Sequence, residues 1–169
     1  MIRLVIVDDM PDIRNYLAEE LAAASEQFSV VGAAEDGTEA VKLVDSLLPD
    51  VVLMDIQMKT RTEGIYAIRI IHERHPDIKC IALTIHEDDE LIFQAYLAGA
   101  ADYIIKTRSI DTIKNSILAV VNNRLLLRPE VGQRLIQEYQ RVQNQENRMK
   151  ETMQAVSYTH LRAHETPEH

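Results

Sequence analysis

The sequence predicts an α/β fold: a doubly wound, five-stranded parallel sheet with helices on both faces, followed by a C-terminal linker helix. Short runs rich in Val and Ile, bounded by Gly or charged residues, are typical of strands buried on both faces. Segments with apolar residues at helical spacing separate these runs. A regular alternation of strand and helix indicates parallel strands joined by right-handed crossovers, with helices on both sides of the sheet.

The strands are expected at five short apolar runs, residues 4–7, 30–33, 51–54, 80–83 and 103–105. Helices are expected from Pro11 onward and at residues 38–48, 65–75, 89–98 and 110–121. Pro11 suits the first turn of a helix, and Gly99 suits the C-cap of the fourth helix. These elements fill residues 1–122, which we predict to be the first domain.

The segment 123–155 is predicted to be a linker that forms one long helix from Pro129. Its apolar residues recur at alternating spacings of three and four, with Glu146 interrupting the pattern, which makes a short and imperfect heptad seam. The helix either packs on its own domain or pairs with a second copy as a coiled coil, and the sequence leaves both open. The seam consists of Leu135, Tyr139, Val142, Met149 and Met153.

The last segment, residues 156–169, has no apolar period. Its letters "VSYTHLRAHET" resemble a one-frame translation of a common sequencing-library adapter. We therefore expect a non-native tail here, with the natural sequence known only to about residue 155, and we exclude the tail from fold reasoning. Its three histidines are accordingly not interpreted as metal ligands.

Composition narrows the class of protein. The chain has 169 residues, 46% of them hydrophobic, which suits one globular domain with a substantial core. Its one cysteine, Cys80, excludes a disulfide within the chain and favours a reducing, cytoplasmic compartment. No apolar stretch approaches membrane-spanning length, and the opening residues do not form a signal peptide.

Charge argues against direct nucleic-acid binding by the first domain. The formal net charge is −9, and residues 1–122 hold 21 of the 27 acidic but only 11 of the 18 basic residues. Such an acidic surface repels phosphate backbones. Glycine-rich fingerprints of dinucleotide or P-loop nucleotide sites are absent from the sequence.

Polar side chains follow four of the predicted strands. Asp8 and Asp9 follow the first strand, Asp55 the third, Thr84 the fourth and Lys106 the fifth. In a doubly wound sheet the carboxyl ends of the strands meet at one edge, where ligands bind. We expect these five side chains to lie together.

Three clustered carboxylates repel one another, and one lysine cannot neutralise them. A hard divalent ion fits the remaining charge, and oxygen-only ligands indicate Mg²⁺. Lys106 and Thr84 are suitable contacts for phosphoryl oxygens, and a carboxylate such as Asp55 can accept a phosphoryl group. Taken singly, the acid pair could cap a helix, and Thr84 or Lys106 could be an ordinary strand-end or surface residue. The joint arrangement is what favours a site.

The residues named above are part of a wider resemblance to a known family. Residues 3–122 are similar to the receiver domain of bacterial two-component response regulators, which implies a flavodoxin-like sheet of order 2-1-3-4-5. The matching segments are "LVIVDDMPDIR", "VVGAAEDGTEAVKL", "PDVVLMDIQM", "IALTIHEDDE" and "AGAADYIIKT".

The resemblance implies a role for each site residue. Asp55 would be the phosphoacceptor for a sensor histidine kinase, with slow self-dephosphorylation, and Lys106 and Thr84 would contact the phosphoryl group. Mg²⁺ would be held by Asp8, Asp9 and Asp55 together with the main-chain carbonyl of Gln57.

Three further positions match tuning or switching positions of the family. Tyr103 would be an aromatic switch, although plain core packing explains it nearly as well. Gln57 and His86 would influence how long the phosphoryl group survives, whereas His86 alone would be read as a surface residue. The chain departs from the common pattern at Lys59, where proline is usual, and the loop "KTRTEG" looks one residue longer than typical.

Segments near the end of the match further resemble the NarL/FixJ class, which carries a LuxR-type helix-turn-helix domain after such a linker. No helix-turn-helix sequence is visible here. The resemblance therefore implies a truncated transcription regulator that would bind DNA through a domain missing from this chain and could form a homodimer on phosphorylation.

Two other functions stay open. A Mg²⁺-dependent phosphatase of haloacid-dehalogenase type also uses an aspartyl nucleophile, but it would want an acid where Gln57 stands. A non-phosphorylated interaction module would not need the full set of three carboxylates and a lysine.

Overall fold

The computed structural model describes residues 1–85, 87–124 and 129–165. The chain divides into two compact units, Met1–Leu127 and Arg128–His169. The first holds the sheet and five helices, and the second holds one long helix. Each unit is described by itself.

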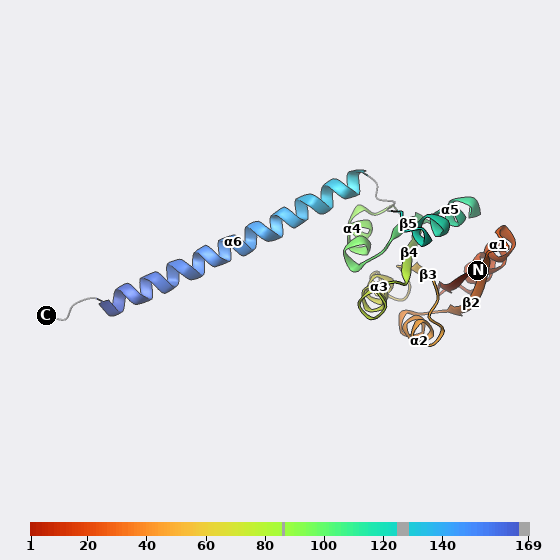
Figure 1. Ribbon diagram of the computed structural model, residues 1–169, viewed down its shortest axis with the longest axis horizontal. Coiled ribbons are helices and arrows are strands. Elements are labelled where there is room, and N and C mark those ends of the chain that lie inside the picture. The colour runs from red at the N-terminus through yellow and green to blue at the C-terminus, as the bar shows by residue number, and fades with distance from the viewer. Residues whose placement is uncertain (86, 125–128, 166–169) are drawn as a thin grey trace. The chain divides into compact units, whose positions relative to one another are not determined.

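Five parallel strands form the sheet in the order β2-β1-β3-β4-β5, as predicted (Figure 1). β3 is buried along its whole length, which explains its unbroken apolar run before Asp55. Its neighbours are β1 and β4, so Val7 lies beside Met54 and Asp55 lies beside Leu83. The strands are β1 (Ile2–Val7), β2 (Phe28–Ala34), β3 (Val51–Asp55), β4 (Lys79–Thr84) and β5 (Asp102–Ile105).

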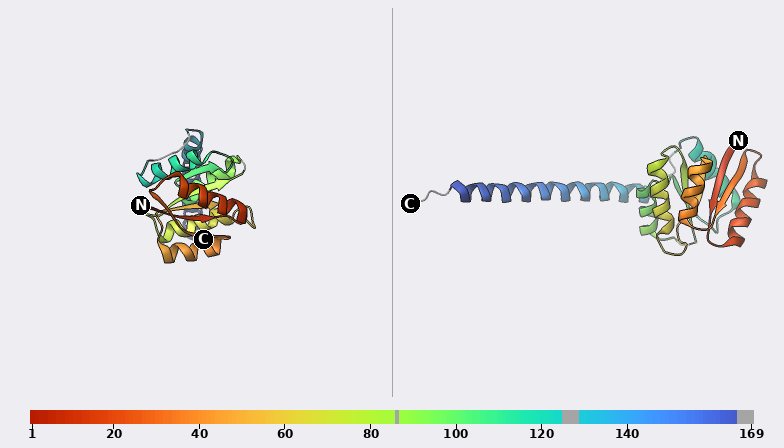
Figure 2. Two further views of the ribbon diagram at one scale, coloured as in Figure 1. Left: turned by 90° about the vertical axis from the view of Figure 1, so that its right-hand side faces the viewer. Right: turned by 90° about the horizontal axis from the view of Figure 1, so that it is seen from below.

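Helices cover both faces of the sheet (Figure 2). α1 packs beside α5 on one face, while α2 packs on α3 and α3 on α4 across the other. Between the sheet and the α1–α5 pair lies a core that includes Leu17, Leu53, Ile81 and Ile113. The helices are α1 (Pro11–Ala24), α2 (Gly37–Leu47), α3 (Glu63–Arg74), α4 (Asp89–Ala98) and α5 (Ile110–Val121).

Local capping explains where the helices begin and end. Asp36 accepts a hydrogen bond from Glu39 N at 2.8 Å, so α2 starts one residue earlier than periodicity alone predicts. Asp88 and Ser109 cap α4 and α5 in the same way. Gly99 closes α4 with a φ of 113°, a left-handed conformation that glycine adopts without steric strain.

The second unit contains α6 (Pro129–Glu165), which confirms the long helix predicted from Pro129. Several apolar side chains of the heptad seam are exposed, among them Tyr139, Val142, Met149 and Met153. The helix continues past residue 155 into the segment that resembles an adapter translation, and the non-native origin of that segment stays a prediction. Among the described residues, no helix is long and apolar enough to cross a membrane.

Candidate functional site

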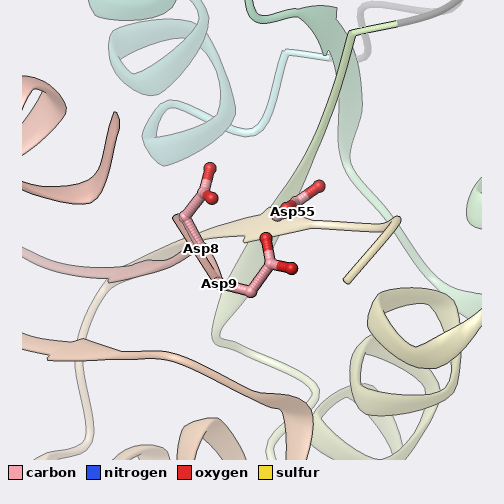
Figure 3. A group of neighbouring side chains, drawn as sticks. All are labelled: Asp8, Asp9 and Asp55. Carbon is pink, nitrogen blue, oxygen red and sulfur yellow. The ribbon is translucent and has the colours of Figure 1, made fainter. Parts of the chain in front are cut away.

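Three carboxylates meet where β1 and β3 end, as the strand-end argument predicts (Figure 3). Asp8 and Asp9 follow β1 directly, and Asp55 is the last residue of β3. Each of the three offers an oxygen, and these oxygens all lie within 4.8 Å of one another. Asp8 and Asp55 are buried and Asp9 is exposed, so the cluster reaches solvent through Asp9.

Lys106 brings a positive charge into this cluster from the end of β5. Its Nζ lies 2.6 Å from Asp8 Oδ2 and 3.0 Å from Asp55 Oδ2. The lysine side chain is only 8% exposed. One buried ammonium therefore faces two buried carboxylates, and the three buried charges sum to −1.

Burial raises the pKa of the Asp55 carboxyl to about 6, and the negative charge of Asp8 adds to this effect. Lys106 acts in the opposite direction by its charge and its hydrogen bond, and Gln57 N donates a weaker hydrogen bond to Asp55 Oδ1 at 3.2 Å. The carboxylate form is thus the majority form at neutral pH, but only by about tenfold. A bound cation would increase that fraction.

Main-chain hydrogen bonds fix the residues around the carboxylates. Asp8 Oδ1 accepts from Met10 N at 2.9 Å, so its side chain turns the chain toward α1. Lys106 N donates to the Thr84 carbonyl at 2.7 Å, which locks the ends of β4 and β5 together. Thr84 itself is completely buried beside this contact. Four strand ends therefore position Asp8, Asp55, Thr84 and Lys106 at one edge of the sheet.

Gly64, in the first turn of α3, is a structural requirement of the site that the sequence reading missed. A Cβ at this position would lie 2.8 Å from the Asp55 carbonyl carbon, and closer still to the Asp55 carbonyl oxygen and Ile56 Cα. Only glycine lets α3 approach the backbone that carries Asp55. The clue in the sequence is the glycine that ends the loop "KTRTEG" inside an otherwise helical pattern.

Glu63 holds the same loop from its other side. Its Oε1 accepts from Gly37 N at 3.0 Å, and its Oε2 accepts from Lys59 N at 3.2 Å. One side chain thereby joins the start of α2 to the β3–α3 loop. This contact of Glu63 could not be predicted from the sequence, because Gly37 precedes it by 26 residues.

The remaining predicted site positions are Tyr103, Gln57 and His86. Tyr103 is 3% exposed and lies beside Ala82 in the sheet, so its side chain is already inside the domain. That placement agrees with core packing and with the inward position of a switch residue. Gln57 is half-buried next to Asp55, and His86 lies outside the described residues. A second acidic group of the described chain, Glu35, Asp36 and Glu39, lies in and after the β2–α2 turn.

Comparison with known proteins decides the family. The family model described as "Response regulator receiver domain" matches residues 4–118, which cover the sheet except for the first two residues of β1, and most of α5. The chain belongs to the response regulator receiver family.

Relatives of this receiver domain are transcriptional regulators. The transcriptional regulatory protein DegU of Brevibacillus brevis is 36% identical over 145 residues, which are 86% of this chain and 61% of DegU. YdfI of Bacillus subtilis (strain 168), also a transcriptional regulatory protein, is 34% identical over 157 residues, 92% of this chain and 72% of YdfI. The chain thus spans about three fifths of the length of DegU.

Solved structures agree with the fold of this receiver domain. A LuxR-family two-component response regulator from Aurantimonas sp. SI85-9A1 matches with a TM-score of 0.71 at 27% identity, over 82% of this chain and 98% of that chain. A LuxR-family DNA-binding response regulator from Staphylococcus aureus matches with a TM-score of 0.67 at 26% identity, over 72% and 99%. Receiver domains are in general switches rather than enzymes, and sensor histidine kinases are their partners.

Proposed function

We propose that this receiver domain is a phosphorylation switch in which Asp55 accepts a phosphoryl group from a phosphohistidine of a sensor histidine kinase. The observation that carries the proposal is the contact of the buried Asp55 carboxylate with Lys106 at 3.0 Å, beside the carboxylates of Asp8 and Asp9. An acceptor needs a carboxylate held in place, a cation for the incoming oxygens and a site for a metal ion. Asp55, Lys106 and the acidic cluster would meet these three requirements at one edge of the sheet.

The donor set of the acidic cluster fits Mg²⁺. Asp8, Asp9 and Asp55 offer carboxylate oxygens, and the Gln57 carbonyl follows two residues after Asp55. Hard oxygen donors and an exposed side that leaves room for water suit Mg²⁺ better than softer metals. When bound, the ion would neutralise the excess negative charge and draw phosphoryl oxygens toward the cluster.

The transfer itself needs only the groups already named. An Asp55 carboxylate oxygen attacks phosphorus as the P–N bond of the phosphohistidine breaks, and the imidazole nitrogen leaves with the electron pair of that bond. Lys106 and Thr84 would bind the phosphoryl oxygens by charge and by hydrogen bond. The buried ammonium then faces an added charge of roughly −1.5 to −2.

The output of the switch would lie around β4, α4 and β5. Movement of Thr84 and Lys106 toward the phosphoryl group would repack the region that contains the buried Tyr103. Gln57 and His86, each two residues past a site residue, would influence the rate of slow self-dephosphorylation. In the whole protein, which we place in the cytoplasm with Cys80 reduced, this change would control transcription through a DNA-binding domain outside residues 1–169.

Mass spectrometry tests the acceptor. The protein is incubated with acetyl phosphate and Mg²⁺, and its intact mass is compared with that of Asp55→Asn. One phosphoryl group per chain on the wild type, none on the variant and slow loss after donor removal support the switch. Rapid multiple turnover would point to a phosphatase, and an unlabelled wild-type chain would point to a non-phosphorylated module.

The second unit is proposed to be a linker helix that pairs with another copy when Asp55 is phosphorylated. Its exposed seam residues, which include Val142, Met149 and Met153, support pairing because apolar residues at heptad spacing are stabilised by a partner helix. Sedimentation of Met149→Glu, with and without acetyl phosphate, tests this. A phosphorylation-dependent dimer that survives the substitution would place the dimer surface elsewhere.

A further inference from the structure

An ion pair joins the two loops that flank Asp55. Arg61 lies in the loop between β3 and α3, and its Nη2 contacts Oδ2 of Asp88, the N-cap residue of α4. β3 and β4 are neighbours in the sheet, and the two loops begin directly after Asp55 and Thr84. The Arg61–Asp88 pair therefore spans the sheet edge at which the carboxylates meet.

The Asp88 side chain is held by further hydrogen bonds. Asp88 Oδ1 accepts from Glu90 N at 3.0 Å and from Leu91 N at 3.3 Å, so the carboxylate is fixed on the first turn of α4. The Leu91 amide, together with the Arg61 charge, holds the pKa of Asp88 below its usual range. Arg61 thus faces an ionised acid at neutral pH.

The loop of Arg61 is also tied on its opposite side. Glu63 accepts hydrogen bonds from Gly37 N and Lys59 N, which fastens the loop to the start of α2. Among the described residues, the Glu63 side chain thus ties this loop toward α2, whereas the Arg61 side chain ties it toward α4. The Arg61–Asp88 ion pair therefore connects the β3–α3 loop to the start of α4, on the β4 side of the site.

We propose that Arg61 and Asp88 form a latch that restrains the β3–α3 loop and thereby lengthens the lifetime of the phosphoryl group on Asp55. Arg61 is a positioning residue in this proposal. The inference rests on the proposed role of Asp55 as phosphoacceptor.

The reaction that the latch slows is hydrolysis of the aspartyl phosphate. The oxygen of a water molecule attacks phosphorus, and the bond between phosphorus and the Asp55 oxygen breaks. The electron pair returns to the Asp55 carboxylate, and the water proton passes to solvent. In-line attack requires water to enter from the side opposite the bond that breaks, so a restrained loop at the rim of the site limits both entry and orientation.

The latch is expected to act locally. The Arg61 side chain is 64% exposed, and exposed ion pairs contribute little to global stability. The discriminating variants are Arg61→Gln, Asp88→Asn and the double variant, because asparagine keeps an oxygen that can cap α4. Arg74→Gln is the matched control, since Arg74 pairs with Asp45 on the α2–α3 surface and is 55% exposed.

The first measurement is the half-life of the phosphorylated protein after acetyl phosphate is removed. We expect Arg61→Gln and Asp88→Asn each to shorten it about threefold, the factor that a typical exposed ion pair supplies. The double variant should decay no faster than either single variant, because one interaction is lost in all three. Salt of about 1 M, where the Debye length is about 3 Å, should bring the wild type close to Arg61→Gln.

The second measurement needs no phosphorylation. Amide hydrogen exchange of residues 56–62 should be faster in Arg61→Gln than in the wild type and unchanged in Arg74→Gln. Normal labelling with an unchanged half-life and unchanged exchange would overturn the latch and leave Asp55 as the acceptor. If the wild-type chain takes no label, the acceptor role of Asp55 is rejected, and with it the proposed protection of the phosphoryl group by the latch.

Discussion

Asp55 Oδ2 and Lys106 Nζ lie 3.0 Å apart at the end of two different strands, and both side chains are almost excluded from solvent. The same ammonium lies 2.6 Å from Asp8 Oδ2. Two buried negative charges share one positive charge, so the unphosphorylated site holds electrostatic repulsion that the fold must overcome. That repulsion makes the site receptive to a cation, and it can be measured.

Replacing Lys106 by methionine should destabilise the domain. The substitution removes the cation from two buried carboxylates, and breaking a buried ion pair in this way typically lowers the free energy of unfolding by about 3 kcal/mol. The loss should be largest at pH 7.5 without divalent ions and smaller near pH 5, where protonation of Asp55 relieves the repulsion. Urea unfolding followed by circular dichroism measures both. Lys42→Met, at an exposed position of α2, is the control and should change little.

Replacing Asp55 by asparagine should have the opposite effect at neutral pH. Burial raises the pKa of the folded Asp55 to about 6 from an ordinary 3.8, so the folded state binds the proton more tightly than the unfolded state. Ionisation therefore destabilises the fold as pH rises, by on the order of 2 kcal/mol above pH 6 after allowance for solvent screening.

The sign of this pH dependence is open to a direct test. The stabilisation by Asp55→Asn should be complete above pH 6, shrink as pH falls through that value and vanish below about pH 4, near the unfolded pKa of 3.8. Unfolding curves of the two proteins, taken across this range in a chelating buffer, provide the measurement. A stability difference that stays constant with pH would show that the Asp55 carboxyl has an ordinary pKa.

Added Mg²⁺ should stabilise the wild-type domain through the acidic cluster. A ligand present at a hundredfold excess over its dissociation constant contributes about 2.7 kcal/mol to the free energy of unfolding. Asp9→Asn should abolish most of the resulting rise in Tm, because Asp9 is the exposed carboxylate of the cluster. Glu39→Gln is the matched control in the other acidic group. If the rise in Tm disappears in Glu39→Gln but persists in Asp9→Asn, the ion binds at the β2–α2 turn and not at the cluster of Asp8, Asp9 and Asp55.

The polar residues of the site were predictable because the sheet is parallel. Each follows an unbroken apolar run, and a parallel sheet brings all carboxyl ends to one edge, so the positions of Asp8, Asp55, Thr84 and Lys106 follow from chain order alone. The helix limits were less predictable. Periodicity marks the buried face of a helix, whereas its first residue depends on a cap such as Asp36, which lies outside the apolar pattern.

Contacts between loops could not be predicted from the sequence. Arg61 and Asp88 are separated by 27 residues, and Glu63 and Gly37 by 26. Charged side chains in such loops follow no periodic pattern in the sequence. Whether two of them come into contact depends on the path of the irregular backbone that connects strands and helices. Tyr103 shows a different limit, because a buried aromatic ring in β5 satisfies core packing and switching equally well. Sequence and static structure agree on its place, and only a comparison of the two phosphorylation states assigns its role.

Replacing Gly64 by alanine should disturb the acceptor through the backbone. The added Cβ would overlap the Asp55 carbonyl oxygen and Ile56 Cα, so either α3 or the end of β3 must move. Overpacking against rigid main chain is expected to lower the free energy of unfolding by about 3 kcal/mol.

Gly37→Ala is the matched control, because its Cβ would come no closer than 3.3 Å to its neighbours and alanine favours the helix. Thermal unfolding gives the stability of each variant, and labelling by acetyl phosphate gives its acceptor activity. We expect Gly64→Ala to lose both and Gly37→Ala to keep both. A Gly64→Ala variant as stable and as readily labelled as the wild type would show that α3 does not hold Asp55 in position.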